Sequence, residues 1–164
     1  MIVVADTSPL IVLINIGQID LLPKLFHSVL VPPEVVSELR GSRASPSVSQ
    51  FAASPPAWLK IQAPRRLVSG LSLHPGEVAA ISLAIELRAE LLLMDEKEGR
   101  LAATRNNLEV AGTVGVLEKA AAEKFINLKD AFDALKQTDF WIPHTFLDAR
   151  LQAFELQRPG GREQ

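Results

Sequence analysis

Two short apolar runs of this chain each end in an aspartate. Asp6 follows the run at 2–5 (IVVA), and Asp95 follows the run at 91–94 (LLLM). Parallel strands present their carboxyl ends at one edge of a sheet, where open α/β sheets bind ligands, so we expect the two carboxylates to lie near each other. Neighbouring carboxylates repel unless a hard divalent cation lies between them. The pattern therefore predicts a cation site.

Two glutamates could complete this acidic site. Glu38 and Glu77 both lie in predicted helices, Glu77 in the first turn. Ordinary explanations exist for both, since Glu38 could be a solvated surface residue and Glu77 could interact with the helix dipole. Asp6 and Asp95 could likewise be cap or turn residues before helices. The prediction rests on the two strands that end in the same way.

Strands are expected to alternate with helices along the chain. Short apolar runs predict strands at 2–5, 29–31, 58–61, 91–94 and 110–111. Helical spacing and stop signals predict helices at 8–14, 18–25, 33–40, 74–89, 96–105, 113–124, 129–137 and 144–156. Ser8 is expected to cap the first helix, and the apolar residues of helix 74–89 are expected on one face: Val78, Ile81, Ala84 and Ile85. The alternation predicts an α/β fold with a parallel sheet.

Composition limits the classes of function. The chain has 164 residues, no cysteine and a formal net charge of −2, so thiolate metal sites are excluded and nucleic acid would need a local basic patch or a bound cation. Asp6 interrupts the first apolar run, so we expect no secretory leader, no membrane span and a cytoplasmic location. Residues 1–155 are expected to form one domain, and 156–164 a disordered tail.

Other chemistries fit the sequence less well. We find no phosphate-binding loop that ends in Gly-Lys-Ser or Gly-Lys-Thr, and no Gly-x-Ser-x-Gly elbow. A phosphatase of the halo-acid-dehalogenase type needs an aspartate two residues after Asp6, where this chain has Ser8. A receiver domain needs paired acids near the end of the first strand, and that pattern is not clear here.

Four segments resemble the motifs of PIN-domain nucleases, in the same order. They are residues 3–10 (VVADTSPL), 31–39 (VPPEVVSEL), 74–84 (HPGEVAAISLA) and 91–100 (LLLMDEKEGR). A fifth segment, 110–117 (VAGTVGVL), is similar to a later segment of a little-characterised prokaryotic PIN branch. The resemblance covers nearly all of residues 1–155. Glu77 departs from it, because many toxins of the family have an aspartate there.

The resemblance implies a three-layer α/β/α sandwich with a central parallel sheet. It also implies Mg²⁺ or Mn²⁺ at the acidic cluster and hydrolysis of RNA phosphodiester bonds. Many small members are VapC-like toxins of type II toxin–antitoxin pairs, held inactive by a small antitoxin protein, and homodimers are common. The acids carried over are Asp6, Glu38, Glu77 and Asp95.

Further roles follow as expectations from ligand chemistry. Mg²⁺ keeps several waters, so Asp6 and Asp95 are expected to contact it directly or through one water, and Glu38 and Glu77 through metal-bound waters. Candidate phosphate or RNA contacts, which ordinary capping or surface charge would explain equally well, are Thr7, Ser8, Lys97 and Arg100.

The alternative prediction is a catalytically inactive PIN-like module that binds a protein. Apolar residues near the C-terminus could contact a partner or a second copy, although core packing explains many of them equally well. They are Phe132, Trp141, Phe146, Leu147, Leu151 and Phe154.

Overall fold

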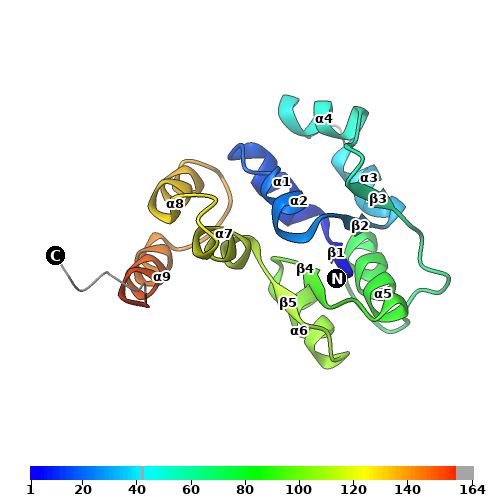
Figure 1. The fold of residues 1–164 in the computed structure, drawn as a ribbon. Coiled ribbons are helices and arrows are strands. Elements are labelled where there is room, and N and C mark those ends of the chain that lie inside the picture. The colour runs from blue at the N-terminus through cyan, green and yellow to red at the C-terminus, as the bar shows by residue number, and fades with distance from the viewer. Residues whose placement is uncertain (42, 158–164) are drawn as a thin grey trace. The chain divides into compact units, whose positions relative to one another are not determined.

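The computed structural model describes residues 1–41 and 43–157 (Figure 1). The chain divides into two compact units, Met1–Val114 and Gly115–Gln164, and all the described strands belong to the first. The prediction of a single domain over residues 1–155 stays a prediction. The boundary predicted for the tail was wrong, because the last helix continues through Gln157, and the rest of that tail, 158–164, lies outside the described residues.

The first unit is built on a parallel sheet of five strands in the order β3-β2-β1-β4-β5. Every neighbouring pair runs parallel, with Ala5 opposite Leu93 where β1 meets β4. This confirms the predicted α/β fold. The strands are β1 (Val3–Ala5), β2 (Val29–Val31), β3 (Leu59–Ile61), β4 (Leu91–Leu93) and β5 (Val110–Ala111).

Helices connect successive strands and cover the sheet as in a three-layer α/β/α sandwich (Figure 1). Among them, α5 packs on β1 and β4, α2 on β2, and α6 on β5. Proline occupies an early position of α3, α4 and α5, where its missing N–H costs nothing. These helices are α1 (Thr7–Asn15), α2 (Leu21–Phe26), α3 (Pro33–Leu39), α4 (Pro46–Ala53), α5 (Pro75–Leu87) and α6 (Lys97–Arg105). Helix α7 (Thr113–Ala122) begins after β5 and belongs mostly to the second unit.

The first helix begins one residue earlier than the sequence predicted. Asp6, with extended backbone, occupies the N-cap position of α1, and Ser8 lies within the helix. The hydroxyl of Ser8 donates to Asp95 instead of capping the helix. The prediction of Ser8 as the cap was therefore wrong, because the helix already begins at Thr7 and Ser8 lies past the N-cap position.

Helix α5 is buried on more sides than its apolar spacing predicted. Ala79, Ala80 and Leu83 are fully or almost fully buried, whereas Val78 and Ile85 are only half-buried. The expected face was therefore only partly right. The reason is that α5 contacts β1, β4 and α3 at once, and small side chains let these elements approach closely. This packing fixes the start of α5, where Glu77 lies.

The second unit consists of most of α7, α8 (Leu128–Lys136) and α9 (His144–Gln157). Asn127 caps α8 by accepting a hydrogen bond from the Asp130 backbone N–H at 3.0 Å. Phe132 and Leu147 are buried, which favours the core-packing explanation for these two residues. Trp141 and Phe146 are exposed. In the described part of the chain, no helix has the length and apolar character needed to cross a bilayer.

Candidate active site

The site lies where the chain changes direction across the sheet. Successive strands add on one side of β1 as far as β3, and the chain then crosses to place β4 on the other side of β1. Crevices at the carboxyl edge of such a switch point bind ligands in open α/β sheets. Asp6 follows β1 and Asp95 lies two residues after β4, so the sheet brings them to the same edge.

Asp6 is buried, with 3% of its surface exposed. Its backbone N–H donates to the Leu93 carbonyl at 2.9 Å, but none of the described residues is a hydrogen-bond partner of its carboxylate oxygen Oδ1. It makes no side-chain capping bond either, so the capping explanation does not account for this aspartate. An unpaired buried carboxylate is costly in its charged form, and a cation is one way to compensate it.

The other three acids influence the titration of Asp6. Burial raises the pKa of Asp6 to about 7, and the charges of Glu77, Glu38 and Asp95 act in the same direction, against the Thr7 backbone N–H. The other three carboxylates predicted from the sequence are therefore close enough to repel Asp6 electrostatically.

Asp95 is held by donors from two other elements. Thr113 donates its backbone N–H to Oδ1 at 2.7 Å and its hydroxyl to Oδ2 at 2.8 Å, and Ser8 donates to Oδ2 at 3.3 Å. Burial raises the pKa of Asp95, while the Thr113 and Ser8 hydrogen bonds and the Arg100 charge oppose the rise. Asp95 thus receives hydrogen bonds from the start of α7, which follows another strand, and interacts electrostatically with Arg100 of α6.

Glu38 is an exposed residue whose carboxylate is nevertheless bound. The Thr7 hydroxyl donates a short hydrogen bond to Oε2, and the Gly76 backbone N–H donates to Oε1 at 3.2 Å. A freely solvated helical glutamate would make neither bond. These contacts tie α3 to the starts of α1 and α5, and they place Glu38 beside the edge that carries Asp6.

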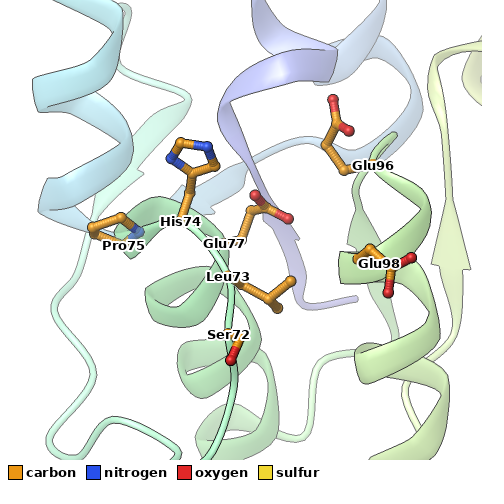
Figure 2. Close-up of a pocket in the computed structure, with 7 residues that line it drawn as sticks. All are labelled: Ser72, Leu73, His74, Pro75, Glu77, Glu96 and Glu98. Carbon is orange, nitrogen blue, oxygen red and sulfur yellow. The ribbon is translucent and has the colours of Figure 1, made fainter.

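Glu77 lines an acidic cavity of about 450 Å³. Figure 2 shows Glu77 between His74, from the segment that begins α5, and the two glutamates that flank the start of α6. Glu77 is buried; burial raises its pKa, Glu96 adds to the rise, and His74 opposes it. The cavity is lined by Ser72, Leu73, His74, Pro75, Glu77, Glu96 and Glu98.

The sequence analysis did not assign a role to Glu96 and Glu98. The signal that could have found them is their position one and three residues after Asp95, at a helix start that must share the carboxyl edge of the sheet. They make the cavity beside Glu77 strongly acidic. A polyanion would approach it only with cations present.

The predicted phosphate contacts fall into two groups. Thr7 and Ser8 already donate their hydroxyls to Glu38 and Asp95, and Arg100 donates to the Met94 carbonyl at 3.3 Å. Lys97, the first residue of α6, is exposed. Two of the four side chains, Thr7 and Ser8, therefore donate to acidic residues, and the roles of all four toward RNA stay predictions.

The residues present suit a hard cation that keeps most of its water. Within residues 1–41 and 43–157, no three acidic or histidine side chains lie in an arrangement that could hold a metal ion by themselves. Mg²⁺ needs only one or two protein carboxylates and completes its shell with water. The unpartnered oxygen of Asp6 is a free ligand of the required chemistry.

Comparison with known proteins agrees with the fold. A family model described as a PIN domain (DUF3368) matches residues 2–156. The structure is similar to that of a PilT N-terminus domain protein from the hyperthermophilic archaeon Sulfolobus solfataricus P2. The TM-score is 0.54 at 18% identity, covering 73% of this chain and 93% of that one. No curated protein matches the sequence. Since the family model spans almost the whole chain, the protein belongs to the PIN-domain family, which has a nuclease-type fold.

Proposed function

We propose that this protein is a metal-dependent endoribonuclease that hydrolyses RNA phosphodiester bonds with Mg²⁺ or Mn²⁺. We further propose that it acts in the cytoplasm as the toxin of a type II pair, restrained by a small antitoxin protein. Membership of the PIN-domain family supports the nuclease class, and PIN domains typically use divalent metals. The toxin role, the antitoxin and a possible homodimer rest on the resemblance to VapC-like proteins.

One observation carries the proposal of a metal site. Asp6 is buried at the switch point of the sheet, one of its oxygens has no partner among the described residues, and three further carboxylates lie near enough to raise its pKa. Capping or sheet packing gives no reason to bury such a group. A divalent cation would neutralise the repulsion and supply the missing partner.

The two aspartates and the two glutamates would have different roles in the mechanism. Asp6 and Asp95 would hold the cation, and Glu38 and Glu77 would bind its water ligands. When bound, Mg²⁺ or Mn²⁺ would polarise the scissile phosphate and lower the pKa of an attacking water. Glu77, whose pKa is raised by burial, would orient that water and accept its proton.

The hydroxyl groups around the site position the acids. Thr113 and Ser8 fix both oxygens of Asp95, and Thr7 fixes Glu38. Their hydrogen bonds keep the carboxylates in place before any ligand arrives, which lowers the cost of ordering them on binding. Lys97 is the exposed cation nearest in sequence to Asp95, and it would contact the RNA backbone.

Two variants test the proposal directly. Asp6→Asn and Asp95→Asn should each abolish Mn²⁺-dependent cleavage of a single-stranded RNA while the protein stays folded. Asp20→Asn is the matched control, because Asp20 is exposed and makes no capping bond. Undiminished cleavage by both site variants, freshly purified and assayed against the same RNA, would contradict the site assignment.

A second candidate function is a PIN-like module that binds a protein without cleaving RNA. The observation in its favour is the exposure of Trp141 (87%) and Phe146 (45%) in the second unit. The two functions differ in their response to metal. A competent site should stabilise the protein by about 2.7 kcal/mol when Mn²⁺ is present at a hundred times its dissociation constant, whereas a module without the site should show no change.

A further inference from the structure

Three of the four acidic residues lie against a glycine at the start of a helix later in the chain. The glycines precede or lie in the first turn of α5, α6 and α7. The pairs are Glu38 with Gly76, Glu77 with Gly99, and Asp95 with Gly112.

The contacts leave no room for a larger residue at these positions. A Cβ atom at Gly76 would lie 2.8 Å from Cδ of Glu38 and 2.9 Å from its Oε2. At Gly99 it would lie 2.7 Å from Oε2 of Glu77, and at Gly112 2.8 Å from Oδ1 of Asp95. These separations are well below the optimum of about 3.5–4.0 Å for non-bonded carbon atoms.

Backbone geometry does not explain the glycines. The described residues with positive φ include Gly17 and Gly70, but none of these three. Gly76 and Gly99 also lie inside helices, where glycine is less favourable than alanine. Helix propensity alone would thus favour alanine at both positions. At Gly76 the three atoms nearest an added Cβ belong to the Glu38 carboxylate, whereas at Gly99 the nearest is the sulfur of the buried Met94.

We propose that Gly76, Gly99 and Gly112 are positioning residues that set where the three carboxylates stand toward the cation, an inference that rests on the proposed function. At each position the contacted carboxylate is the end of a side chain, which can rotate away more easily than a helix can shift. At Gly76, where the three nearest atoms all belong to that carboxylate, an added methyl group would therefore displace it and leave the fold in place.

Gly76 gives the sharpest test of the three. The three heavy atoms nearest to a Cβ added at Gly76 all belong to the Glu38 carboxylate. A Cβ added at Gly99 would also contact Met94, and one added at Gly112 would also contact Arg100. Gly76→Ala keeps the backbone N–H that donates to Glu38. A loss of metal affinity in this variant therefore reports the place of the carboxylate and not the loss of a donor.

The experiment compares Gly76→Ala with the wild type and with Ser37→Ala, an exposed substitution in α3 next to Glu38. We expect the metal-free Gly76→Ala protein to unfold at the same or a higher temperature. Its crystal structure should show the Glu38 carboxylate displaced from the Thr7 hydroxyl, and Mn²⁺ affinity by calorimetry should fall at least tenfold. Ser37→Ala should change neither the carboxylate nor the affinity.

A double variant separates displacement from general damage. Glu38→Asp alone should weaken Mn²⁺ binding, but combined with Gly76→Ala it should restore part of the affinity, since the shorter side chain clears the added methyl. An undisplaced Glu38 carboxylate in the metal-free Gly76→Ala crystal would overturn the proposal. A double variant that binds Mn²⁺ more weakly than either single variant would overturn it too. If the wild type binds no Mn²⁺, the proposed function fails, while the metal-free crystal still decides the role of Gly76.

Discussion

Thr113 binds both oxygens of Asp95, with its backbone N–H at 2.7 Å from Oδ1 and its hydroxyl at 2.8 Å from Oδ2. Thr113 is fully buried and begins α7. The pair joins the end of β4 to the start of a helix that follows another strand. Asp95 therefore has a structural role beside its proposed catalytic one. The Thr113 hydroxyl can be removed by mutation while Asp95 and the Thr113 backbone N–H are kept.

Thr113→Val should destabilise the protein by about 1–3 kcal/mol, because the near-isosteric valine keeps the N–H bond but leaves Oδ2 of Asp95 with one donor fewer. The pKa of Asp95 should also rise, since that hydroxyl bond is one of the contacts that hold it down. Urea denaturation measures the stability change. Thr145→Val, at an exposed position of α9, is the control. An equal decrease in the free energy of unfolding in the two variants would contradict the role given to Thr113.

Asp6 should make the metal-free protein less stable as pH rises. Its pKa is about 7 in the folded protein against an ordinary 3.8, so between these values the folded state holds a proton that the unfolded state has released. The stabilisation is complete below the lower value and is lost as pH rises through the upper one. The free energy of unfolding should fall by as much as about 1.4 kcal/mol per pH unit in this window.

Asp6→Asn should flatten this pH dependence, because the amide does not titrate. The measurement is urea denaturation of both proteins across the window, with chelator present to remove divalent metal. Asp95 and Glu77 also have raised pKa values, so a smaller slope of the same sign should remain in the variant. Identical slopes in the two proteins would show that Asp6 does not titrate in this range.

Lys97 should contribute one contact to the RNA backbone. Lys97→Ala should weaken binding to single-stranded RNA at low salt and reduce the slope of log affinity against log salt by about 0.7, the value for one phosphate contact. Binding is measured by fluorescence anisotropy with Ca²⁺ in place of Mg²⁺. Lys60→Ala, on the exposed edge strand β3, should leave the slope unchanged. Equal slopes for all three proteins would remove Lys97 from the site.

Trp141 should take part in self-association and not in folding. With 87% of its surface exposed, its replacement by serine should change the free energy of unfolding by less than about 0.5 kcal/mol. If this surface joins two copies, sedimentation velocity should show a dimer for the wild type and a monomer for Trp141→Ser. Leu67→Ser, an exposed apolar position of the first unit, serves as control. A variant that dimerises as the wild type does would exclude Trp141 from the interface.

Local sequence determined much of the fold. Apolar runs bounded by Asp6 and Asp95 predicted strands that the structure confirms as β1 and β4, and Pro33 and Pro75 marked helix starts correctly. These features depend on residues within a few positions of one another, through chain stiffness and periodic burial. The resemblance to PIN domains also followed from short motifs, and the family match confirms it.

Some local predictions failed where distant segments decide the outcome. Ser8 has the chemistry of a helix cap, but α1 begins at Thr7 and the Ser8 hydroxyl donates to the carboxylate of Asp95, 87 residues away. Helix α5 has one apolar stripe by spacing, yet several elements pack around it and bury Ala79, Ala80 and Leu83 as well. Neither the contact with Asp95 nor the packing around α5 can be predicted from the segment itself.

The sequence alone determined which residue types end the strands and begin the helices, and hence which side chains could form an acidic site. Only the tertiary structure decided that β4 lies beside β1, that an oxygen of Asp6 has no partner, and that Thr113 binds Asp95. The physical reason is that strand order and side-chain contacts depend on how the crossover helices pack, which is a property of the whole chain. Propensities act within one turn or strand, whereas the place of a carboxylate depends on segments far apart in sequence.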